Sequence, residues 1–289
     1  MTKNPERRWK QHAKDLYERL PLISLLKLVR AVGTPRHYKY LTTSGRFTTQ
    51  LENGESLELI IRHDLYIEKE IFWNGIRCEF EPMTLRTWCE LSADATTILD
   101  IGANTGIFSL LASKYARAAA VHAFEPVPYN ADVLEANIAL NGSAGIHLRR
   151  LALSDTDGEQ TMFVMEDQIN YLNSLEGNRY ESGATEVRVE TAKLATYIED
   201  AGIVDIDLIK LDVEGHEVSV LAGMEDYLSR FKPTLIIEVL DDEMGAQLQS
   251  LLEPIGGYRF FLIDDISMRI EEMAEIRTPH RTNFLIRVD

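Results

Sequence analysis

Continuous apolar runs alternate with amphipathic segments from about residue 97 onward. Continuous runs are typical of strands that helices cover on both faces, and the intervening segments have helical spacing. Strand–helix alternation predicts an α/β fold with a doubly wound, Rossmann-like parallel sheet. The predicted strands are TILDIG, AAVHAFEP, GIHLRRLAL, IDLIKLDV and TLIIEVL, and the predicted helices are FSLLASKYA, NADVLEANIALNG and HEVSVLAGMEDYLSRF.

Two regions depart from this alternation. YRFFLID and TNFLIRV, near the end of the chain, have no helical crossover between them, so at least one should run antiparallel at the sheet edge. Between the third and fourth core strands, at about residues 154–192, TMFVM and EVRVETA are expected to pair as inserted strands. The core, including this insertion, would therefore occupy residues 92–289.

The chain ahead of the core divides into two further segments. Residues 46–91 are expected to form a hairpin, with a two-residue turn at Asn53-Gly54, and a helix from about Pro82. Residues 1–45 are expected to be helical, split near Pro21. Residues 1–37 carry nine Lys or Arg against three acids, so this extension is basic.

The second N-terminal helix, LISLLKLVRAV, is amphipathic, with Leu22, Leu25, Leu26 and Val29 at helical spacing. A basic amphipathic helix can lie on an anionic membrane surface. It can equally pack on the main domain or on the partner in a homodimer. The narrow apolar stripe favours packing, and membrane contact and oligomeric state stay open.

Composition excludes several classes of protein. The 289 residues are 45% hydrophobic and 26% charged, as in globular proteins and unlike disordered chains. No apolar run reaches the roughly 18 residues of a transmembrane helix. The net charge of −16 disfavours nucleic acid as a partner. Two cysteines and no recognisable secretory signal predict a cytoplasmic protein with reduced thiols.

The turn after the first core strand carries the main candidate chemistry. It reads Asp100-Ile101-Gly102-Ala103-Asn104-Thr105-Gly106, and ligands of open α/β sheets bind at such strand ends. The next strand ends in Phe124-Glu125-Pro126, where an acid can accept hydrogen bonds from both ribose hydroxyls.

The loop distinguishes between nucleotide cofactors. The spacing is GxxxG rather than the GxGxxG of dinucleotide-binding proteins, and no P-loop GK[ST] follows. The acidic Asp100 would repel a pyrophosphate but suits the amino group of a methionine moiety. S-adenosylmethionine (SAM) therefore fits the loop better than NAD.

Five motifs in order carry a family resemblance: DIGANTG, AFEP, LALSD, DLIKLDVEGHE and LIIEV. Over about residues 46–289 the chain resembles the FkbM family of SAM-dependent methyltransferases. The resemblance implies a class I methyltransferase fold, with a seven-stranded sheet whose last strand is antiparallel. It also implies O-methylation, commonly of a sugar or natural-product hydroxyl.

The resemblance implies roles for individual residues as well. Glu125, beside Pro126, should hold the ribose with support from Asn130, and Asp212 should lie between cofactor and acceptor. Leu153 and Ser154 should lie along the adenine. The methionine part of SAM should be surrounded by the first loop, with Asp100, Gly102, Ala103, Asn104 and Gly106.

Three residues are candidates for the general base that a poorly nucleophilic hydroxyl needs: Asp212, His216 and Glu238. His216 is equally suited to a structural role at the start of a helix. Glu214 and Glu217 would there be stabilised by the helix dipole. Asp212 and Glu238 could together bind a divalent metal, as in some related O-methyltransferases. Without an adjacent acid pair or histidine cluster, the sequence favours a metal-free site.

The acceptor is expected to be a small molecule or glycan. Aromatic, acidic and amide side chains outside the core pattern suit a polyhydroxyl compound, although the aromatic ones can equally pack the hairpin. The candidates are Tyr66, Trp73, Glu81, Tyr171, Asn173 and Ser174. N-methylation and non-catalytic SAM binding remain alternatives. The acid pairs Asp241-Asp242 and Asp264-Asp265 are expected to be solvated loop charges.

Overall fold

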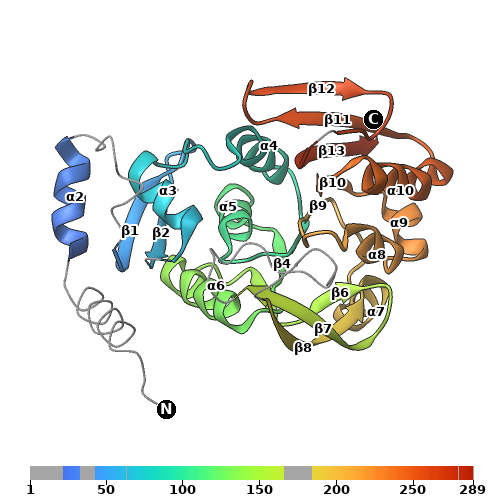
Figure 1. Cartoon of the computed structure of the whole chain (residues 1–289), viewed down its shortest axis with the longest axis horizontal. Coiled ribbons are helices and arrows are strands. Elements are labelled where there is room, and N and C mark those ends of the chain that lie inside the picture. Colours follow the sequence, from blue (N-terminus) through green and yellow to red (C-terminus); the bar gives the residue numbers. More distant parts are fainter. Residues whose placement is uncertain (1–21, 33–42, 63, 166–183, 279, 289) are drawn as a thin grey trace, which may run out of the picture. The chain divides into compact units, whose positions relative to one another are not determined.

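The computed structural model describes residues 22–32, 43–62, 64–165, 184–278 and 280–288 (Figure 1). The chain forms two compact units, residues 1–80 and residues 81–289, which are described separately here. Among the described helices, none is long and apolar enough to cross a membrane. The predicted first N-terminal helix and the candidates Tyr171, Asn173 and Ser174 lie outside the described residues.

The first unit contains helix α2 (Leu22–Val32), strands β1 (Gly45–Gln50) and β2 (Ser56–Ile61), and helix α3 (Tyr66–Asn74). The strands pair antiparallel, which confirms the hairpin. The predicted two-residue turn is wrong, because pairing stops at Gln50 and Ser56 and leaves a five-residue loop. In that loop the Leu51 amide donates to the Glu55 carbonyl at 2.8 Å.

An eight-stranded sheet forms the centre of the second unit, in the order β12-β11-β13-β10-β9-β3-β4-β5. The strands from β10 to β5 are parallel, whereas β13 runs antiparallel to both β10 and β11, as the resemblance implied. β12 adds an antiparallel edge strand to the seven expected. Their bounds are β3 Thr97–Ile101, β4 Ala120–Phe124, β5 Ile146–Arg149, β9 Leu208–Leu211, β10 Thr234–Val239, β11 Tyr258–Asp264, β12 Arg269–Met273 and β13 Thr282–Val288.

Helices cover both faces of this sheet, as its continuous apolar strands require. Figure 1 shows α4, α5 and α6 on one side of the strands and α7 to α10 on the other. Apolar side chains of α7 to α10 join those of β3, β9 and β10 in one buried cluster. The helices are α4 Pro82–Ser92, α5 Ile107–Tyr115, α6 Pro128–Asn141, α7 Leu194–Ala201, α8 Glu217–Ala222, α9 Asp226–Phe231 and α10 Asp242–Leu252, followed by the 3-10 turn Glu253–Ile255.

Two predicted elements are each divided in the structure. The third strand splits into β5 and β6 (Ala152–Ser154), and the helix after β9 splits into α8 and α9. Gly223, which follows α8, lies close to β6, since a Cβ at this position would lie 2.0 Å from the Ser154 carbonyl oxygen. Glu225 then turns the chain with a positive φ of 52°.

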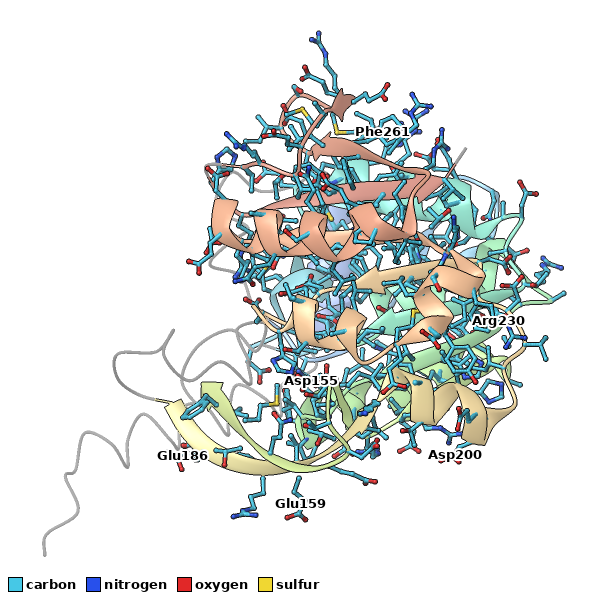
Figure 2. The ribbon with its side chains drawn as sticks, turned by 90° about the vertical axis from the view of Figure 1, so that its right-hand side faces the viewer. Asp155, Glu159, Glu186, Asp200, Arg230 and Phe261 are labelled. Atoms are coloured by element: carbon cyan, nitrogen blue, oxygen red, sulfur yellow. The ribbon has the colours of Figure 1, made fainter. Side chains whose placement is uncertain are left out.

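The insertion forms a separate three-stranded sheet in the order β6-β8-β7. β7 (Gly158–Met165) and β8 (Ala184–Lys193) pair antiparallel, as TMFVM and EVRVETA predicted. A small apolar cluster that includes Val127, Met162 and Val189 packs this sheet. Figure 2 shows Glu159 and Glu186 on the outer edge of the ribbon, so its acidic side chains face away from the main sheet.

Candidate functional site

A cleft opens at the carboxyl ends of β3, β4 and β9, the edge at which ligands of such sheets bind. Several predicted cofactor residues line this cleft, as does the candidate base His216. The lining residues are Ile101, Gly102, Asn104, Phe124, Glu125, Pro126, Asn130, Leu151, Ala152, Leu153, Met162, Asp212, Val213, Glu214 and His216.

The glycines of the first loop allow close packing. A Cβ at Gly102, whose φ is +82°, would lie 1.8 Å from the Asp212 carbonyl oxygen. A Cβ at Gly106 would lie 2.1 Å from Cδ1 of Leu134 on α6. Side chains at either position would push the loop away from β9 or α6, so both glycines are needed to shape the cleft.

Glu125 ties the first two loops together from inside the cleft. Its Oε2 accepts from the Asn104 amide at 2.8 Å, and its Oε1 accepts from the Val127 amide at 2.9 Å. Burial raises the pKa of this carboxyl to about 7. The side chain both holds the loop backbone and presents its remaining acceptor capacity to the cleft.

Other predicted cofactor residues lie behind the lining rather than in it. Asp100 is buried, accepts a hydrogen bond from the Ser109 hydroxyl at 2.5 Å, and has its pKa raised to about 6 by burial. Ala103, Gly106 and Ser154 do not line the cleft either. The structure thus gives Asp100 a contact with α5, and its expected contact with a methionine amino group stays a prediction.

The loop after β9, Asp212-Val213-Glu214-Gly215-His216-Glu217, is closed by its own last residue. Glu217 accepts from the Val213 amide at 2.9 Å and from the Gly215 amide at 3.0 Å. The side chain is fully buried, and burial raises its pKa to about 7. Glu217 is therefore a loop-closing acceptor, beyond the helix-dipole role that the sequence indicated.

His216 connects this loop to β6. Its Nε2 lies 3.0 Å from the Ser154 hydroxyl oxygen, and both residues are buried. Because β6 ends at Ser154, the contact fixes the edge of the cleft that Leu153 lines. The imidazole is thus engaged in a structural contact while still facing the cleft.

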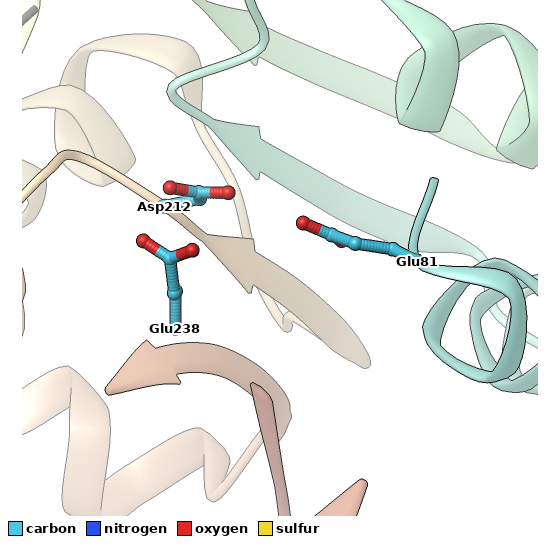
Figure 3. A group of neighbouring side chains, drawn as sticks. All are labelled: Glu81, Asp212 and Glu238. Carbon is cyan, nitrogen blue, oxygen red and sulfur yellow. The ribbon is translucent and has the colours of Figure 1, made fainter. Parts of the chain in front are cut away.

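Three carboxylates converge beside Asp212. Glu81, Asp212 and Glu238 each place an oxygen within 4.8 Å of the other two (Figure 3). Glu81 immediately precedes α4, Asp212 follows β9, and Glu238 lies near the end of β10. One oxygen each of Glu81 and Glu238 is buried and has no hydrogen-bond partner within the described residues. Burial raises the pKa of Glu81 to about 7 and that of Glu238 well above its usual range.

Two cations act on these carboxylates. The fully buried Lys210 places Nζ 3.1 Å from an Asp212 oxygen. Although burial alone would lower the pKa of Lys210, the charges of Asp212 and Glu81 raise it. Nη1 of Arg281 lies 3.4 Å from Oε1 of Glu238, and the Arg281 guanidinium also donates bidentate hydrogen bonds to the Glu214 carboxylate. Sequence reasoning missed both, although a lysine inside the apolar strand LIKL was a usable signal.

Asp265 anchors the helix that follows Glu81. It accepts from the amides of Met83 at 2.7 Å and Thr84 at 2.9 Å, the first turn of α4. The prediction of a solvated charge is wrong here, because the free amides of a helix N-terminus attract an acid. The other acids of these pairs also bind amides: Asp241 binds Met244, Asp242 binds Thr278, and Asp264 binds Ile266 and Ser267.

The remaining acceptor candidates lie in the first unit. Trp73 is 2% exposed and packs edge-to-face on Phe72 with ring centroids 5.0 Å apart. Tyr66, at the start of α3, is half-buried. Trp73 thus takes part in the core of its own unit, which is the packing alternative that the sequence left open.

The family model for the methyltransferase FkbM domain matches residues 100–274, more than half of the chain. The chain belongs to the FkbM methyltransferase family. The matched region begins at Asp100 and includes the cleft residues from Gly102 to His216 as well as Glu238. This FkbM-family chain is thus a methyltransferase with a class I Rossmann-like fold.

Curated relatives agree with this family. The chain is 29% identical over 187 residues to the methyltransferase sdnD of Sordaria araneosa, which covers 55% of this chain and 72% of the relative. It is 29% identical over 206 residues to the 31-O-demethyl-FK506 methyltransferase FkbM of Streptomyces tacrolimicus. That alignment covers 62% of this chain and 76% of the relative. It is 26% identical over 181 residues to methyltransferase 1 of Beauveria bassiana, covering 56% and 72%.

Proposed function

We propose that this FkbM-family methyltransferase uses SAM to methylate a hydroxyl on a sugar, glycolipid or secondary metabolite. The observation that carries the proposal is the position of Asp212. It lines the cleft after β3, β4 and β9 and is also a member of the carboxylate cluster. A methyl donor in the cleft and a hydroxyl at the cluster would therefore meet at one side chain.

The cleft residues fit SAM. Gly102 lets the first loop pack against the Asp212 backbone at the cleft, and Glu125 presents a buried carboxylate where ribose hydroxyls would need an acceptor. Leu153 and Met162 supply apolar walls suited to an adenine ring. SAM, when bound, supplies an electrophilic methyl on a positively charged sulfur. The chain's own work is then to align the acceptor and exclude water.

The carboxylate cluster suits a hydroxyl acceptor. An aliphatic hydroxyl must lose its proton as its oxygen bonds to the methyl carbon, and Asp212 and Glu238 are placed to accept it. His216 is the third candidate, but its Nε2 already contacts Ser154. We therefore assign the proton to Asp212 or Glu238 and give His216 a positioning role.

The name of one relative supports this choice of acceptor class. It is called a 31-O-demethyl-FK506 methyltransferase, a name that specifies methylation at oxygen on a natural product. The net charge of −16 opposes nucleic acid. Cytoplasmic location, homodimer formation and membrane contact through residues 1–37 remain predictions from sequence.

A label-transfer experiment tests the proposal. The full chain and methyl-labelled SAM are added to host extract separated into polysaccharide, lipid, small-molecule, protein and nucleic-acid fractions. Label in one of the first three fractions, released by treatments that cleave O-methyl but not N-methyl groups, supports it. Label in protein or nucleic acid, or on nitrogen, would overturn the acceptor assignment.

A matched variant separates turnover from binding. Asp212→Asn keeps the shape of the side chain but removes its charge, so SAM should still bind while transfer falls. If the wild type binds SAM and labels no fraction, the non-catalytic alternative gains support. Calorimetric titration with SAM supplies the binding measurement for both proteins.

A further inference from the structure

We propose that Glu81, Asp212 and Glu238 form a binding site for one hard divalent cation of the Mg²⁺, Mn²⁺ or Ca²⁺ class. All three offer carboxylate oxygens, the ligands that such cations prefer. Their ligand atoms lie within 4.8 Å of one another, a span that oxygens bound to a common ion can occupy (Figure 3).

Orphaned oxygens supply the observation that distinguishes this cluster from an ordinary group of acids. Glu238 is 4% exposed, and its Oε2 has no hydrogen-bond partner within the described residues. Oε2 of Glu81 is likewise buried and has no hydrogen-bond partner within the described residues. A buried acceptor left unpaired costs free energy, so a ligand that satisfies these atoms is expected.

Asn283 adds an uncharged oxygen, its side-chain Oδ1, at the same place. It is 3% exposed, and its Oδ1 also has no hydrogen-bond partner within the described residues. β13 places it directly opposite Glu238, and its side chain interacts with the Glu81 carboxyl. The orphaned atoms of Glu81, Glu238 and Asn283 are all acceptors, so the missing ligand is a cation or a group rich in donors.

Charge selects the cation. Asp212 shares its carboxylate with Lys210, and Arg281 divides its contact between Glu238 and Glu214. These two cations face the four carboxylates of Glu81, Asp212, Glu214 and Glu238. When all four carboxylates are ionised, a divalent ion would balance the excess negative charge, whereas a neutral hydroxyl would leave it. The nearby Lys210 ammonium would also keep the affinity moderate by repulsion.

The supporting structure holds the ligands in place. Asp265 fixes the start of α4 next to Glu81, and Lys210 and Arg281 orient Asp212 and Glu238. Such contacts are typical of metal sites, whose ligands are oriented by a surrounding layer of hydrogen bonds. If the proposed function holds, the cation would bind the acceptor oxygen and lower the pKa of its hydroxyl. That role, unlike the site itself, rests on the proposed function.

Metal binding to the full chain tests the site directly. Chelator-treated protein is titrated with Mn²⁺, followed by electron paramagnetic resonance, and with Mg²⁺ and Ca²⁺ by calorimetry. We expect one ion per chain. Glu238→Gln and Glu81→Gln should each weaken binding at least tenfold, while Glu271→Gln, an exposed acid on β12, should not. Thermal melts of all variants check that the amide substitutions preserve the fold.

The outcomes separate this proposal from the proposed function. No ion at millimolar concentration, or binding that both cluster variants leave unchanged, overturns the site. One bound ion together with undiminished methyl transfer in chelator overturns its role and leaves O-methylation standing. One bound ion with no methylated hydroxyl supports the site and counts against the acceptor class. The affinity for SAM should differ by no more than a few-fold between protein with metal and protein without it.

Discussion

Two sets of carboxylates lie in or near the loop after β9. They differ in whether their oxygens have hydrogen-bond partners. Glu125 and Glu217 accept hydrogen bonds from backbone amides of the loops that they hold. Glu81 and Glu238 each keep a buried oxygen without a hydrogen-bond partner in the described parts of the chain. Burial raises the pKa of all four. Burial alone therefore does not distinguish the two sets, whereas the unsatisfied oxygen does.

The largest effect should come from the unsatisfied set. Glu238→Gln removes a carboxylate that the proposed chemistry needs, so methyl transfer should fall by roughly 10²–10⁴-fold. Thermal stability should hold or rise, because the substitution removes the repulsion between the Glu238 and Asp212 carboxylates. Steady-state kinetics and a thermal melt of the same preparation test both statements. A large loss of stability would place Glu238 with the structural set instead.

The opposite pattern is expected for Glu217→Ala. The amides of Val213 and Gly215 would lose their acceptor inside the protein, at about 1–3 kcal/mol for each unsatisfied group. We expect the free energy of unfolding to fall by about 2–4 kcal/mol in chemical denaturation. Glu243→Ala is the control, since Glu243 is an exposed acid in the first turn of α10 and senses only the helix dipole. If both variants lost the same free energy of unfolding, the contribution of Glu217 would be explained by the helix dipole alone.

Sequence patterns predicted the place of Glu125 better than the meeting of Glu81 with Asp212 and Glu238. Glu125 and the glycine loop follow the ends of neighbouring parallel strands, and such strands bring their carboxyl ends to one edge whatever the side chains do. The approach of Glu81 and Arg281 to this edge depends on how α4 packs on the sheet and on the pairing of β13 with β10. No local spacing encodes it. The close approach of Gly223 to the Ser154 carbonyl likewise depends on tertiary packing.

Glu125→Gln should affect SAM rather than turnover. A glutamine cannot accept from two partners on both terminal atoms, so the ribose and the Asn104 amide would compete for one oxygen. Loss of a hydrogen bond to a charged group predicts SAM affinity lower by roughly 10–100-fold. Calorimetric titration measures the change. Affinity equal to that of the wild type would remove the ribose assignment.

The pH dependence of SAM binding gives a smaller effect with a definite sign. The pKa of Glu125 is raised to about 7 by burial, so the carboxyl is mostly protonated at pH 6 and ionised at pH 8. Ribose hydroxyls bind best to the ionised form, and affinity should rise about tenfold from pH 6 to pH 8. The same burial makes ionisation unfavourable for folding, so this group's contribution to stability falls with rising pH.

Glu125→Gln is also the control for that titration. If Glu125 causes the pH dependence, the variant should bind SAM with an affinity that hardly changes between pH 6 and pH 8. SAM carries an amino group of its own, and any change due to that group would persist in the variant. A persistent tenfold change would therefore move the effect from the protein to the ligand.

His216 provides the smallest and most discriminating effect. From sequence, His216→Ala should lower turnover more than SAM affinity, as expected of a general base. The contact with Ser154 predicts instead a positioning role, in which His216→Ala and Ser154→Ala each change the KM for SAM about fivefold, with little change in kcat. The double variant should then resemble either single one, because both substitutions remove the same hydrogen bond. A fall in kcat for His216→Ala far beyond that for Ser154→Ala would restore the base assignment, because only the imidazole can take a proton.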